Sequence, residues 1–455
     1  MSGRIAKVSV LVLSWNGRKH LEICLPALES QALPGRDFEI LLLDNGSHDD
    51  TVAWVKRHHP RVRLLASQNN LGFCAGNNRL AEEAGGEALV LLNNDTRPRE
   101  GWLAALAGAL EAAPADVAAV SGQIVDWEGQ RLDFARGMMT FDGHAFQHGY
   151  RRPLAGIALP PAGSELLFAC GGNMIVRRAS FFEAGAFDAD YFAYLEDVDL
   201  GWRLWAGGER VIFEPSATVH HRSMATSQVL GNENRGFLFE RNALLTAYKN
   251  FDDDHWPRLM PLVLLTLIHR TQTLLVQNNP GGGLITLDPY AGLIANTAWP
   301  EALAEAARAA GESPAGESPV APAPPRTSLA EKWRGYGPRE LMKRGVRKAL
   351  RGLLPRFVFE DPAAAMPRVT DPRTLAQLRV LSWTIGHLED TAAKRRRLQA
   401  RRKRSDAEIF ERFPLAVVPT YPGDEKLFAG EAFAAAWPAG VPRVDLALAE
   451  IMDMS

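Results

Sequence analysis

The first 125 residues alternate between strand-like and helix-like segments, and this alternation restricts the chain to few folds. Buried strands are predicted from the β-branched and leucine runs at 8–14, 38–43, 62–66, 88–92 and 117–121. Helical spacing occupies the intervals 18–31, 50–58, 75–84 and 102–112. Because parallel strands are joined by crossovers that usually contain a helix, the pattern predicts an α/β domain with a mostly parallel sheet flanked by helices.

Polar residues fall at the carboxyl ends of several predicted strands. Asn16 follows the first strand, Asp44 follows the second and Asp95 follows the fourth. In open sheets of this kind, ligands bind beyond the carboxyl ends of the strands. The Asp44 carboxylate is suited to accept from a base N–H or a sugar hydroxyl, although a plain turn also favours aspartate. Asp95 is suited to Mg²⁺ or Mn²⁺, which take few protein oxygens and complete their shell with water and phosphate.

Three further segments carry candidate functional residues. The Asn- and Gly-rich stretch 69–78, with Asn70 and Asn77, is either a loop leading into a helix or a cradle for phosphate or sugar. Glu196 and Asp197 begin an amphipathic helix, where acids are favoured by the helix dipole. The aromatic segment 191–195 before them would raise a carboxylate pKa and suit a general base. The pair His220-His221 follows a strand-like run and is a candidate ligand.

Composition excludes several classes of protein. With 51 Lys and Arg against 53 Asp and Glu, the formal charge of −2 argues against binding nucleic acid through bulk charge. Three widely spaced cysteines build neither a disulfide framework nor a cysteine zinc site, which fits a reducing compartment. The dinucleotide-binding, phosphate-loop and hydrolase-elbow glycine motifs do not occur. We therefore expect neither a dehydrogenase, a P-loop NTPase nor an α/β-hydrolase.

The remainder of the chain suggests a helical C-terminal extension. We expect a catalytic domain over 1–235 (halves 1–125 and 126–235), a helical extension over 236–311, a Pro/Ala-rich linker over 312–328 and a basic, partly helical region over 329–455. The apolar run 259–268 is about half the length of a bilayer crossing, and His269-Arg270 closes it. The basic run 394–404 is read as a solvated helix face, with an anionic lipid or acidic partner as the alternative.

Taken together, the motifs resemble the inverting glycosyltransferases of family 2, which have the GT-A fold. The resemblance covers residues 7–227, and the motifs occur in the family's order. The segments that carry it are VSVLVLSWNG, LLLDNGSHDDT, NNLGFCAGNN, LVLLNNDTRP, ACGGNMIVRR, YLEDVDLGWRLWAGG and ATVHHRSMATS. Within the family, the sequence looks most similar to bacterial rhamnosyltransferase-type enzymes of cell-surface polysaccharide synthesis.

The resemblance implies a role for each candidate residue. On the donor side, Asn16 lies in the first nucleotide-binding turn, Asp44 binds the base, and Gly172 lies near the donor sugar. Asn93, Asn94 and Asp95 occupy the place of the Asp-x-Asp metal motif, although Asn93 replaces its first aspartate. His220 is the implied second metal ligand, with His221 as the alternative. Asp197 takes the position of the catalytic base, with Glu196 beside it.

The implied activity is that of a metal-dependent inverting glycosyltransferase with Mg²⁺ or Mn²⁺. The donor would be a nucleoside diphosphate sugar, with dTDP-rhamnose favoured over a UDP-sugar. The acceptor would be a surface polysaccharide or a lipid-linked glycan. We expect a cytoplasmic location, with peripheral contact to the inner face of the cell membrane left open. Two alternatives remain, namely a sugar nucleotidyltransferase and a non-catalytic scaffold that binds sugar nucleotides.

Overall fold

The computed structural model of the chain describes residues 5–222, 231–283 and 368–453. The described residues form two compact units. One contains the chain up to Thr271 together with Leu375 onward, and the other contains Gln272–Thr374. The predicted linker 312–328 and the basic stretch 343–356 lie outside the described residues.

A ten-stranded sheet organises the larger unit, in the order β10-β12-β6-β11-β4-β1-β2-β3, with β5 beside β12 and β7 beside β6. The strands that share one direction are β1 (Lys7–Ser14), β2 (Asp37–Asp44), β3 (Arg63–Ala66), β4 (Ala88–Asn93), β6 (Val117–Asp126) and β12 (Arg210–His221). The opposite direction is taken by β5 (Thr96–Pro98), β7 (Leu132–Phe134), β10 (Glu165–Leu166) and β11 (Asn173–Arg177). The predicted mostly parallel α/β sheet is confirmed.

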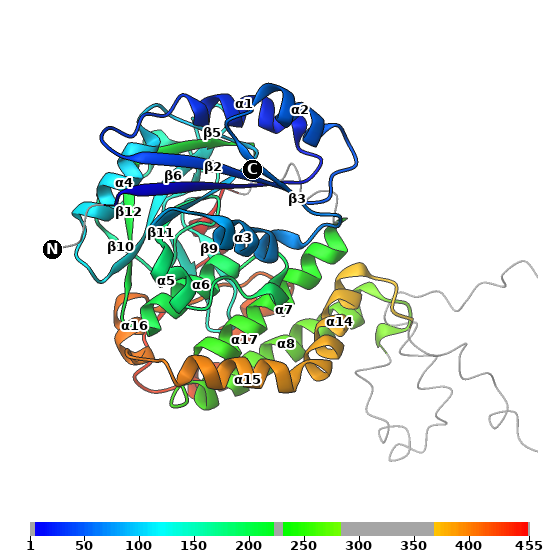
Figure 1. Cartoon of the computed structure of the whole chain (residues 1–455). Helices are drawn as coiled ribbons and strands as arrows, with labels where there is room; N and C mark the ends of the chain where they lie inside the picture. Colours follow the sequence, from blue (N-terminus) through cyan, green and yellow to red (C-terminus); the bar gives the residue numbers. More distant parts are fainter. Residues whose placement is uncertain (1–4, 223–230, 284–367, 454–455) are drawn as a thin grey trace, which may run out of the picture. The chain divides into compact units, whose positions relative to one another are not determined.

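Helices cover both faces of this sheet. Figure 1 shows α1 (Arg18–Glu29) and α2 (Thr51–His58) over one face, and α3 (Gly72–Glu83), α5 (Arg178–Glu183) and α6 (Glu196–Ala206) over the other. The helix α4 (Trp102–Ala112) packs against β6 and β12. The central strands are buried from both sides, which explains why β1, β2 and β4 are almost continuously apolar in sequence.

The antiparallel strand β11 is inserted between β4 and β6. It brings the segment 170–173 to the same edge of the sheet as the carboxyl end of β4, with Asn93 N donating to Gly172 O at 3.3 Å. The Asn173 amide is fully buried and bridges this strand to β6 and β12 through the carbonyls of Gln123 and Ala217, both at 2.9 Å. The insertion thereby joins segments from the two predicted halves of the domain, 1–125 and 126–235, in one sheet.

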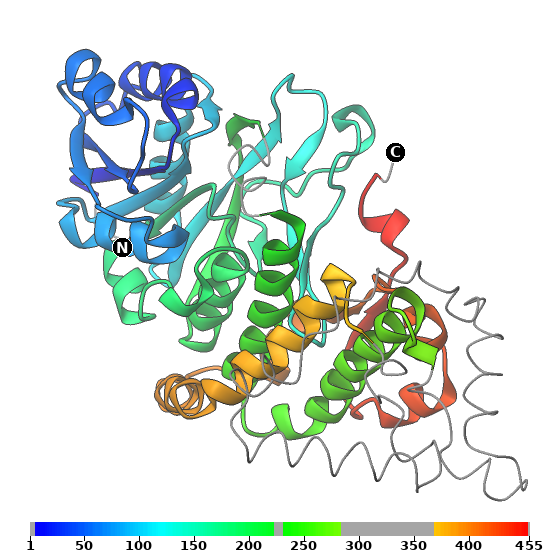
Figure 2. The same ribbon diagram turned by 90° about the vertical axis from the view of Figure 1, so that its right-hand side faces the viewer.

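The helical C-terminal region is present as predicted. Its described helices are α7 (Gly231–Asn250), α8 (Trp256–Asn278), α14 (Pro372–Gly386), α15 (Leu388–Gln399), α16 (Asp406–Arg412), α17 (Asp424–Phe428), α18 (Glu431–Ala436) and α19 (Leu448–Ile451), with short strands β13 (Leu415–Val417) and β14 (Arg443–Asp445). Figure 2 shows α15 running alongside α7. From α16 onward, seven buried residues belong to the same hydrophobic core as the sheet, namely Ile409, Phe410, Leu415, Val417, Phe428, Phe433 and Val441.

The apolar helix α8 lies within the predicted helical extension 236–311. It continues past His269-Arg270, the pair that closes the apolar run 259–268, and ends at Asn278. By length and composition α8 is able to span a membrane, and 44% of its most apolar window is buried within the structure. In the smaller unit, the Asn279 side chain fixes the residues just before α14. Its Oδ1 accepts from Thr370 N (2.7 Å) and Asp371 N (3.0 Å).

Candidate active site

A pocket of about 660 Å³ opens at the carboxyl ends of the parallel strands. It is lined by segments that are far apart in the sequence, namely the ends of β1, β4 and β12, the strand β7 and the start of α6. The predicted site residues that line it are Asn70, Asn93, Asn94, Asp95, Gly172, Glu196, Asp197 and His221. The structure therefore brings most of the candidate residues, including acids 102 positions apart, into one cavity.

One edge of the pocket pairs Asp95 with His221. The His221 Nε2 atom lies 3.2 Å from the Asp95 carboxylate, and both side chains are largely buried. On its other side, His221 Nδ1 donates to Asp133 Oδ2 at 2.8 Å. Although burial opposes the charge, the two carboxylates raise the pKa of His221 to about 10. Burial alone would raise the pKa of Asp95. The hydrogen bond and charge of His221 outweigh burial and hold the pKa of Asp95 below its ordinary value.

His220 points away from Asp95. Successive side chains of a strand face opposite sides, so β12 presents only one of its two terminal histidines to the pocket. The Nε2 atom of His220 accepts from Arg99 Nε at 3.1 Å, and its Nδ1 lies 3.1 Å from the Trp127 carbonyl. Of the two histidines, the structure thus places the alternative, His221, at the candidate metal position, and His220 is not among the pocket-lining residues.

The residues before Asp95 close the floor of the pocket. Asn94 is 6% exposed and its amide donates to Ser14 Oγ at 2.9 Å, which fixes the turn after β4 to the end of β1. A Cβ atom on Gly172 would approach the Asn93 amide nitrogen to 2.9 Å, closer than ordinary contacts. A side chain at 172 would therefore have to displace the Asn93 side chain.

The opposite edge carries the two acids at the start of α6. Both oxygens of Asp197 accept from backbone amides, Oδ2 from Gly171 N (3.0 Å) and Oδ1 from Val198 N (2.9 Å). Burial raises the pKa of Asp197. Burial, and then the charge of Asp197, raise the pKa of Glu196 to about 8. Among the described residues, Glu196 Oε2 has no hydrogen-bond partner. The pair is therefore suited to hold one proton at neutral pH.

The loop before these acids has a strained backbone. Phe192, Tyr194 and Leu195 all have positive φ angles (61°, 72° and 63°), which non-glycine residues seldom adopt. The amide of Asn242 on α7 fixes this loop by donating to the carbonyls of Tyr191, Ala193 and Tyr194 at 3.1, 2.8 and 2.7 Å. Such strain persists only where neighbouring contacts enforce it. Sequence reasoning did not identify Asn242, because no motif marks a single buried amide.

The predicted donor residues Asp44, Asn16 and Asn77 do not line the pocket. Asp44 is 2% exposed, and its Oδ2 accepts from Ser47 N at 3.1 Å. Within the described chain, its Oδ1 is buried without a hydrogen-bond partner. Asn16 is exposed, has φ +49°, and accepts from His48 N at 2.8 Å. The Asn77 amide is buried and donates to Phe73 O within its own helix.

Asn45, which sequence reasoning passed over, lines the pocket beside Asn70. Its Nδ2 donates to Asn70 Oδ1 at 2.9 Å, and its Oδ1 accepts from Leu71 N at the same distance. These bonds join the turn after β2 to the turn before α3. The signal that could have found it is its position, because it directly follows the strand-end aspartate.

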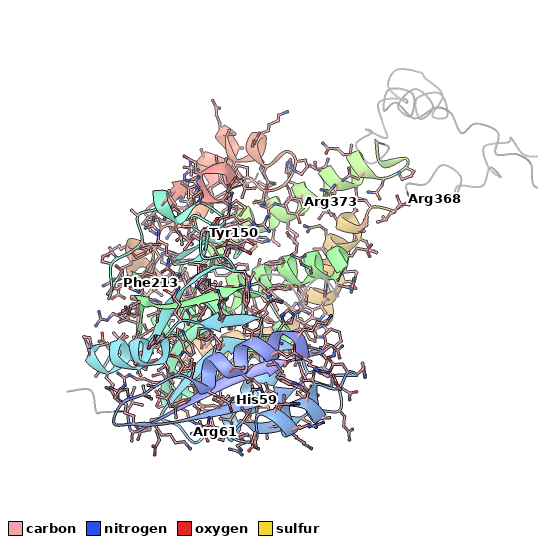
Figure 3. All side chains as sticks on the ribbon, turned by 90° about the horizontal axis from the view of Figure 1, so that it is seen from above. His59, Arg61, Tyr150, Phe213, Arg368 and Arg373 are labelled. Carbon is pink, nitrogen blue, oxygen red and sulfur yellow. The ribbon has the colours of Figure 1, made fainter. Side chains whose placement is uncertain are left out.

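Aromatic side chains form much of the remaining wall. They are Phe73, Phe134, Phe146, Tyr150, Phe168, Phe192, Tyr194 and Phe239. Tyr150 (Figure 3) lies beside Met452 through a parallel bridge, and Met452 also lines the pocket. The ion pair of Arg131 with Asp453 at 2.8 Å holds this C-terminal segment in place. Aromatic and apolar walls suit the non-polar face of a sugar or a hydrocarbon chain.

A second acidic group is less suited to a metal. Asp252, His255 and Asp406 place one potential ligand atom each within 4.8 Å of the others. However, Asp252 Oδ2 accepts from Asp406 N and Asp406 Oδ2 accepts from Asp252 N, at 2.9 and 2.6 Å. His255 and Arg402 occupy the other oxygens. This group joins α8 to α16 and lies outside the pocket.

The sequence of the chain is similar to one known family and to curated members of it. The sequence profile described as "Glycosyl transferase family 2" matches residues 9–183. An N-acetylglucosaminyl-diphospho-decaprenol L-rhamnosyltransferase of Mycobacterium tuberculosis is 31% identical over 244 residues, which are 48% of this chain and 77% of that protein. The O-antigen biosynthesis protein RfbC of Myxococcus xanthus is 33% identical over 196 residues, 41% of this chain and 15% of that protein.

Solved structures give more distant matches. GalNAc-T7 with UDP, GalNAc and Mn²⁺ has a TM-score of 0.44 at 14% identity, over 66% of this chain and 54% of that one. The mannosyltransferase PcManGT from Pyrobaculum calidifontis with GDP-Man and Mn²⁺ has a TM-score of 0.37 at 18% identity, over 68% and 84%. At this distance the matches carry no information about donor or acceptor.

Proposed function

The chain belongs to glycosyl transferase family 2 and is a glycosyltransferase, and on that premise we propose that it transfers a sugar with inversion from a nucleoside diphosphate donor to a lipid-linked or surface glycan. The observation that carries the proposal is a single pocket with Asp95 and His221 at one edge and Glu196 and Asp197 at another. The family assignment disfavours the nucleotidyltransferase and scaffold alternatives.

The Asp95 edge would hold the donor diphosphate through a divalent ion. The fit rests on a carboxylate and an imidazole that lie 3.2 Å apart and line one pocket. Imidazole is a poor ligand for Mg²⁺, which takes oxygen ligands, so this pair favours Mn²⁺. When bound, the ion supplies Lewis-acid stabilisation of the charge that develops on the leaving diphosphate. Asp44 at the end of β2, whose buried Oδ1 has no hydrogen-bond partner in the described part of the chain, is the proposed ligand of the base.

Asp197 would act as the general base. The amides of Gly171 and Val198 fix its carboxylate, and burial raises its pKa toward the range useful for proton transfer. It accepts the proton of the acceptor hydroxyl while that hydroxyl attacks the anomeric carbon from the face opposite the diphosphate. One displacement at a carbon with oxocarbenium character inverts its configuration, as it does in single-step glycoside chemistry.

The donor and acceptor classes follow from two kinds of support. The mycobacterial relative is named for rhamnosyl transfer to a polyprenyl-linked sugar, which favours dTDP-rhamnose and a lipid-linked acceptor. The aromatic wall near Met452 suits such an acceptor. The protein would be located at the inner face of the cell membrane and would contact the membrane peripherally.

The test is transfer by the purified full chain. We would incubate it with Mn²⁺, dTDP-rhamnose or UDP-GlcNAc, and a short-chain GlcNAc-diphospho-prenol, and measure nucleotide release and product mass. The expected result is a product from dTDP-rhamnose whose anomeric configuration by NMR is opposite to that of the donor. Retained configuration would contradict the single displacement. Formation of dTTP and rhamnose 1-phosphate when pyrophosphate is added, without release of dTDP, would favour a nucleotidyltransferase.

A further inference from the structure

The carboxylate of Asp133 lies on the far side of His221 from the proposed metal position. Asp133 is on β7 and His221 is at the end of β12, and both strands pair with β6. β12 pairs with one edge of β6 and β7 with the other. The His221 and Asp133 side chains therefore meet over β6, the strand between them. They line the same pocket, and the side chains of Asp133 and His221 are 9% and 16% exposed.

The direction of the hydrogen bond determines which nitrogen of His221 would bind a metal once the ion displaces the second ring proton. The Asp133 oxygen is an acceptor, so His221 Nδ1 carries the proton in the 2.8 Å bond. The remaining nitrogen, Nε2, faces Asp95. A histidine that binds a metal through one nitrogen commonly donates its other N–H to a carboxylate, which fixes the ring and its tautomer.

We propose that Asp133 is a positioning residue that holds the His221 ring with Nε2 directed to the metal site. This assignment rests on the proposed function, because it presupposes a metal at Asp95 and His221. Asp133 is not itself a ligand: the structure places its carboxylate on Nδ1, and within the described residues no three ligand atoms of Asp95, Asp133 and His221 lie within 4.8 Å of one another. It acts through the imidazole.

The geometry predicts an order of effects for two substitutions. Asp133→Ala removes the acceptor for Nδ1–H, which lets the ring rotate and change tautomer, so the dissociation constant for Mn²⁺ should rise 10–100-fold. Asp133→Asn keeps an oxygen that accepts from Nδ1–H, so most of the Mn²⁺ affinity should remain. A directly ligating carboxylate would behave differently, because the amide replaces it poorly.

The experiment measures Mn²⁺ binding by the full chain with dTDP, using electron paramagnetic resonance to count free Mn²⁺. The affinity for dTDP in EDTA and the melting temperature are measured in parallel. The dTDP affinity in EDTA should stay near the wild-type value in both variants, because the proposed role of Asp133 runs through the metal ligand His221. Asp133→Asn should also keep the wild-type melting temperature. The matched control is Asp126→Asn, since Asp126 shapes the preceding turn through Gln130 N and Arg131 N.

The possible outcomes separate this assignment from the proposed function. Wild-type Mn²⁺ affinity in Asp133→Ala would overturn the positioning role alone. An equal loss in Asp133→Asn and Asp133→Ala would overturn it in favour of direct ligation. A loss of metal-free dTDP affinity together with melting temperature would assign Asp133 a purely structural role. If the wild-type chain binds no Mn²⁺ with dTDP, the proposed metal site itself fails, and the assignment with it.

Discussion

Both oxygens of Asp197 accept from backbone amides, so Asp197→Asn keeps the size of the side chain and one of these two hydrogen bonds but removes its basicity. We expect Asp197→Asn to lower the transfer rate by about 10²–10⁴-fold, because the amide cannot take the proton of the acceptor hydroxyl. The dissociation constant for the donor should stay within about threefold. Asp190→Asn is the control, since Asp190 lies outside the pocket and pairs with Lys394. Near wild-type turnover in Asp197→Asn would refute the role of Asp197 as the base.

Glu196 makes the stability of the fold depend on pH. Its pKa is near 8 in the fold and near 4.5 when exposed, so the folded state holds the proton more tightly between these values. Stability that is present below about pH 4.5 is therefore lost as pH rises through 8. At pH 4, Glu196→Gln and the wild type should have the same melting temperature. At pH 9 the variant should melt at a higher temperature, with an unfolding free energy larger by roughly 1–3 kcal/mol. Parallel pH curves for the two proteins would contradict this.

At the scale of residues, the sequence was sufficient to predict those site residues that lie at the end of a strand or at the start of a helix. Asp95, Glu196 and Asp197 belong to this group, and all three line the pocket. The choice between His220 and His221 required the register of β12, which two adjacent identical residues do not reveal. Asp133 lies in a segment without periodicity, so only the fold could bring it to His221.

At the scale of elements, α7 fixes the geometry of the loop before α6. We expect Asn242→Ala to reduce transfer at least tenfold, because it releases the carbonyls of Ala193 and Tyr194 in the strained backbone at 192–195, whereas the Tyr191 carbonyl keeps other donors. Leaving buried carbonyls unpaired should also lower the unfolding free energy by about 1–3 kcal/mol. The control is Thr246→Val, which removes a bond from α7 to the Tyr191 hydroxyl instead. If both variants lost stability but retained full activity, the loop would not position the acids.

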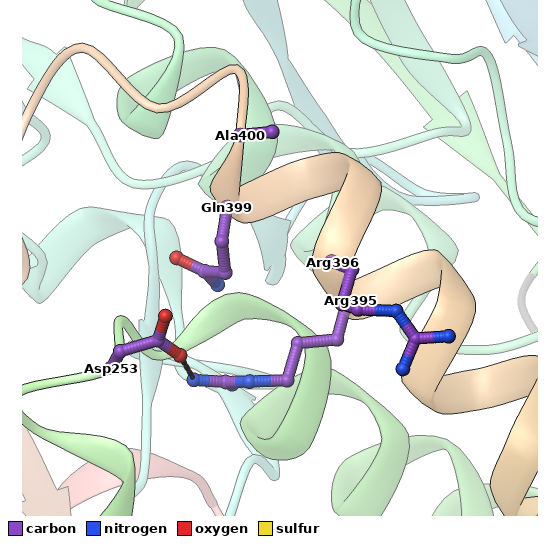
Figure 4. Close-up of a pocket in the computed structure, with 5 residues that line it drawn as sticks. All are labelled: Asp253, Arg395, Arg396, Gln399 and Ala400. Atoms are coloured by element: carbon purple, nitrogen blue, oxygen red, sulfur yellow. Dashed lines mark hydrogen bonds and ion pairs between the residues drawn. The ribbon is translucent and has the colours of Figure 1, made fainter.

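The basic run 394–404 joins elements within the fold. Arg395 donates to the carbonyls of Tyr248 and Phe251 at the end of α7 and pairs with Asp253 at 2.5 Å, as Figure 4 shows for the ion pair. Lys394 pairs with Asp188 and Asp190. The prediction of a solvated helix face therefore holds only for the exposed residues of the run, such as Arg397.

Substitutions in α15 should separate these two groups. Arg395→Ala should lower the unfolding free energy by about 2–3 kcal/mol, because it removes the Arg395 hydrogen bonds to the Tyr248 and Phe251 carbonyls. Within the described residues, the Phe251 carbonyl then keeps only the bond from Gln399. Arg397→Ala, on the same helix but exposed, should change it by less than about 0.5 kcal/mol. Urea unfolding monitored by circular dichroism provides the measurement. Equal losses would mean that the charge of the helix matters and its contacts do not.

The elements themselves were largely predictable, and their partners were not. Periodicity located β1, β2, β4, α1 and α4 within one or two residues, since each is long and strongly patterned. The three-residue strand β5 has no such signal, yet its pairing with β12 sets His221 opposite Thr96. The antiparallel β11 also reads in sequence as any other buried strand, because direction leaves no trace in composition.

At the scale of the larger unit, the C-terminal region completes the core that the sheet begins. Phe141 packs edge-on against Phe428, Phe433 and Trp437, so a hairpin near the pocket is covered by chain almost 300 residues later. Short helices with few periodic positions gave no basis for predicting this docking. The same region supplies Met452 to the wall of the pocket.

A buried cluster of charges ties this region to the domain. Arg270 on α8 is 3% exposed and pairs with Asp142 near the pocket (2.8 Å) and with Asp424 at the start of α17 (3.0 Å). His144 lies 3.2 Å from both Asp142 and Glu240. Although burial opposes it, these two acids raise the pKa of His144 to about 10, so the cluster stays charged across the physiological range.

We expect Arg270→Met to destabilise the protein by about 3–5 kcal/mol, because it removes the buried cation between Asp142 and Asp424 and leaves His144 as the one cation of the cluster beside Asp142 in the described residues. Adding Asp142→Asn and Asp424→Asn should restore part of this loss, since the variant then buries no uncompensated charge there. Arg258→Met is the matched control on α8, where the side chain is exposed and contacts only the Ala439 carbonyl in the described residues. Chemical unfolding gives the values. If the triple variant were less stable than Arg270→Met, shape and hydrogen bonding would hold the C-terminal region in place, and charge pairing would not.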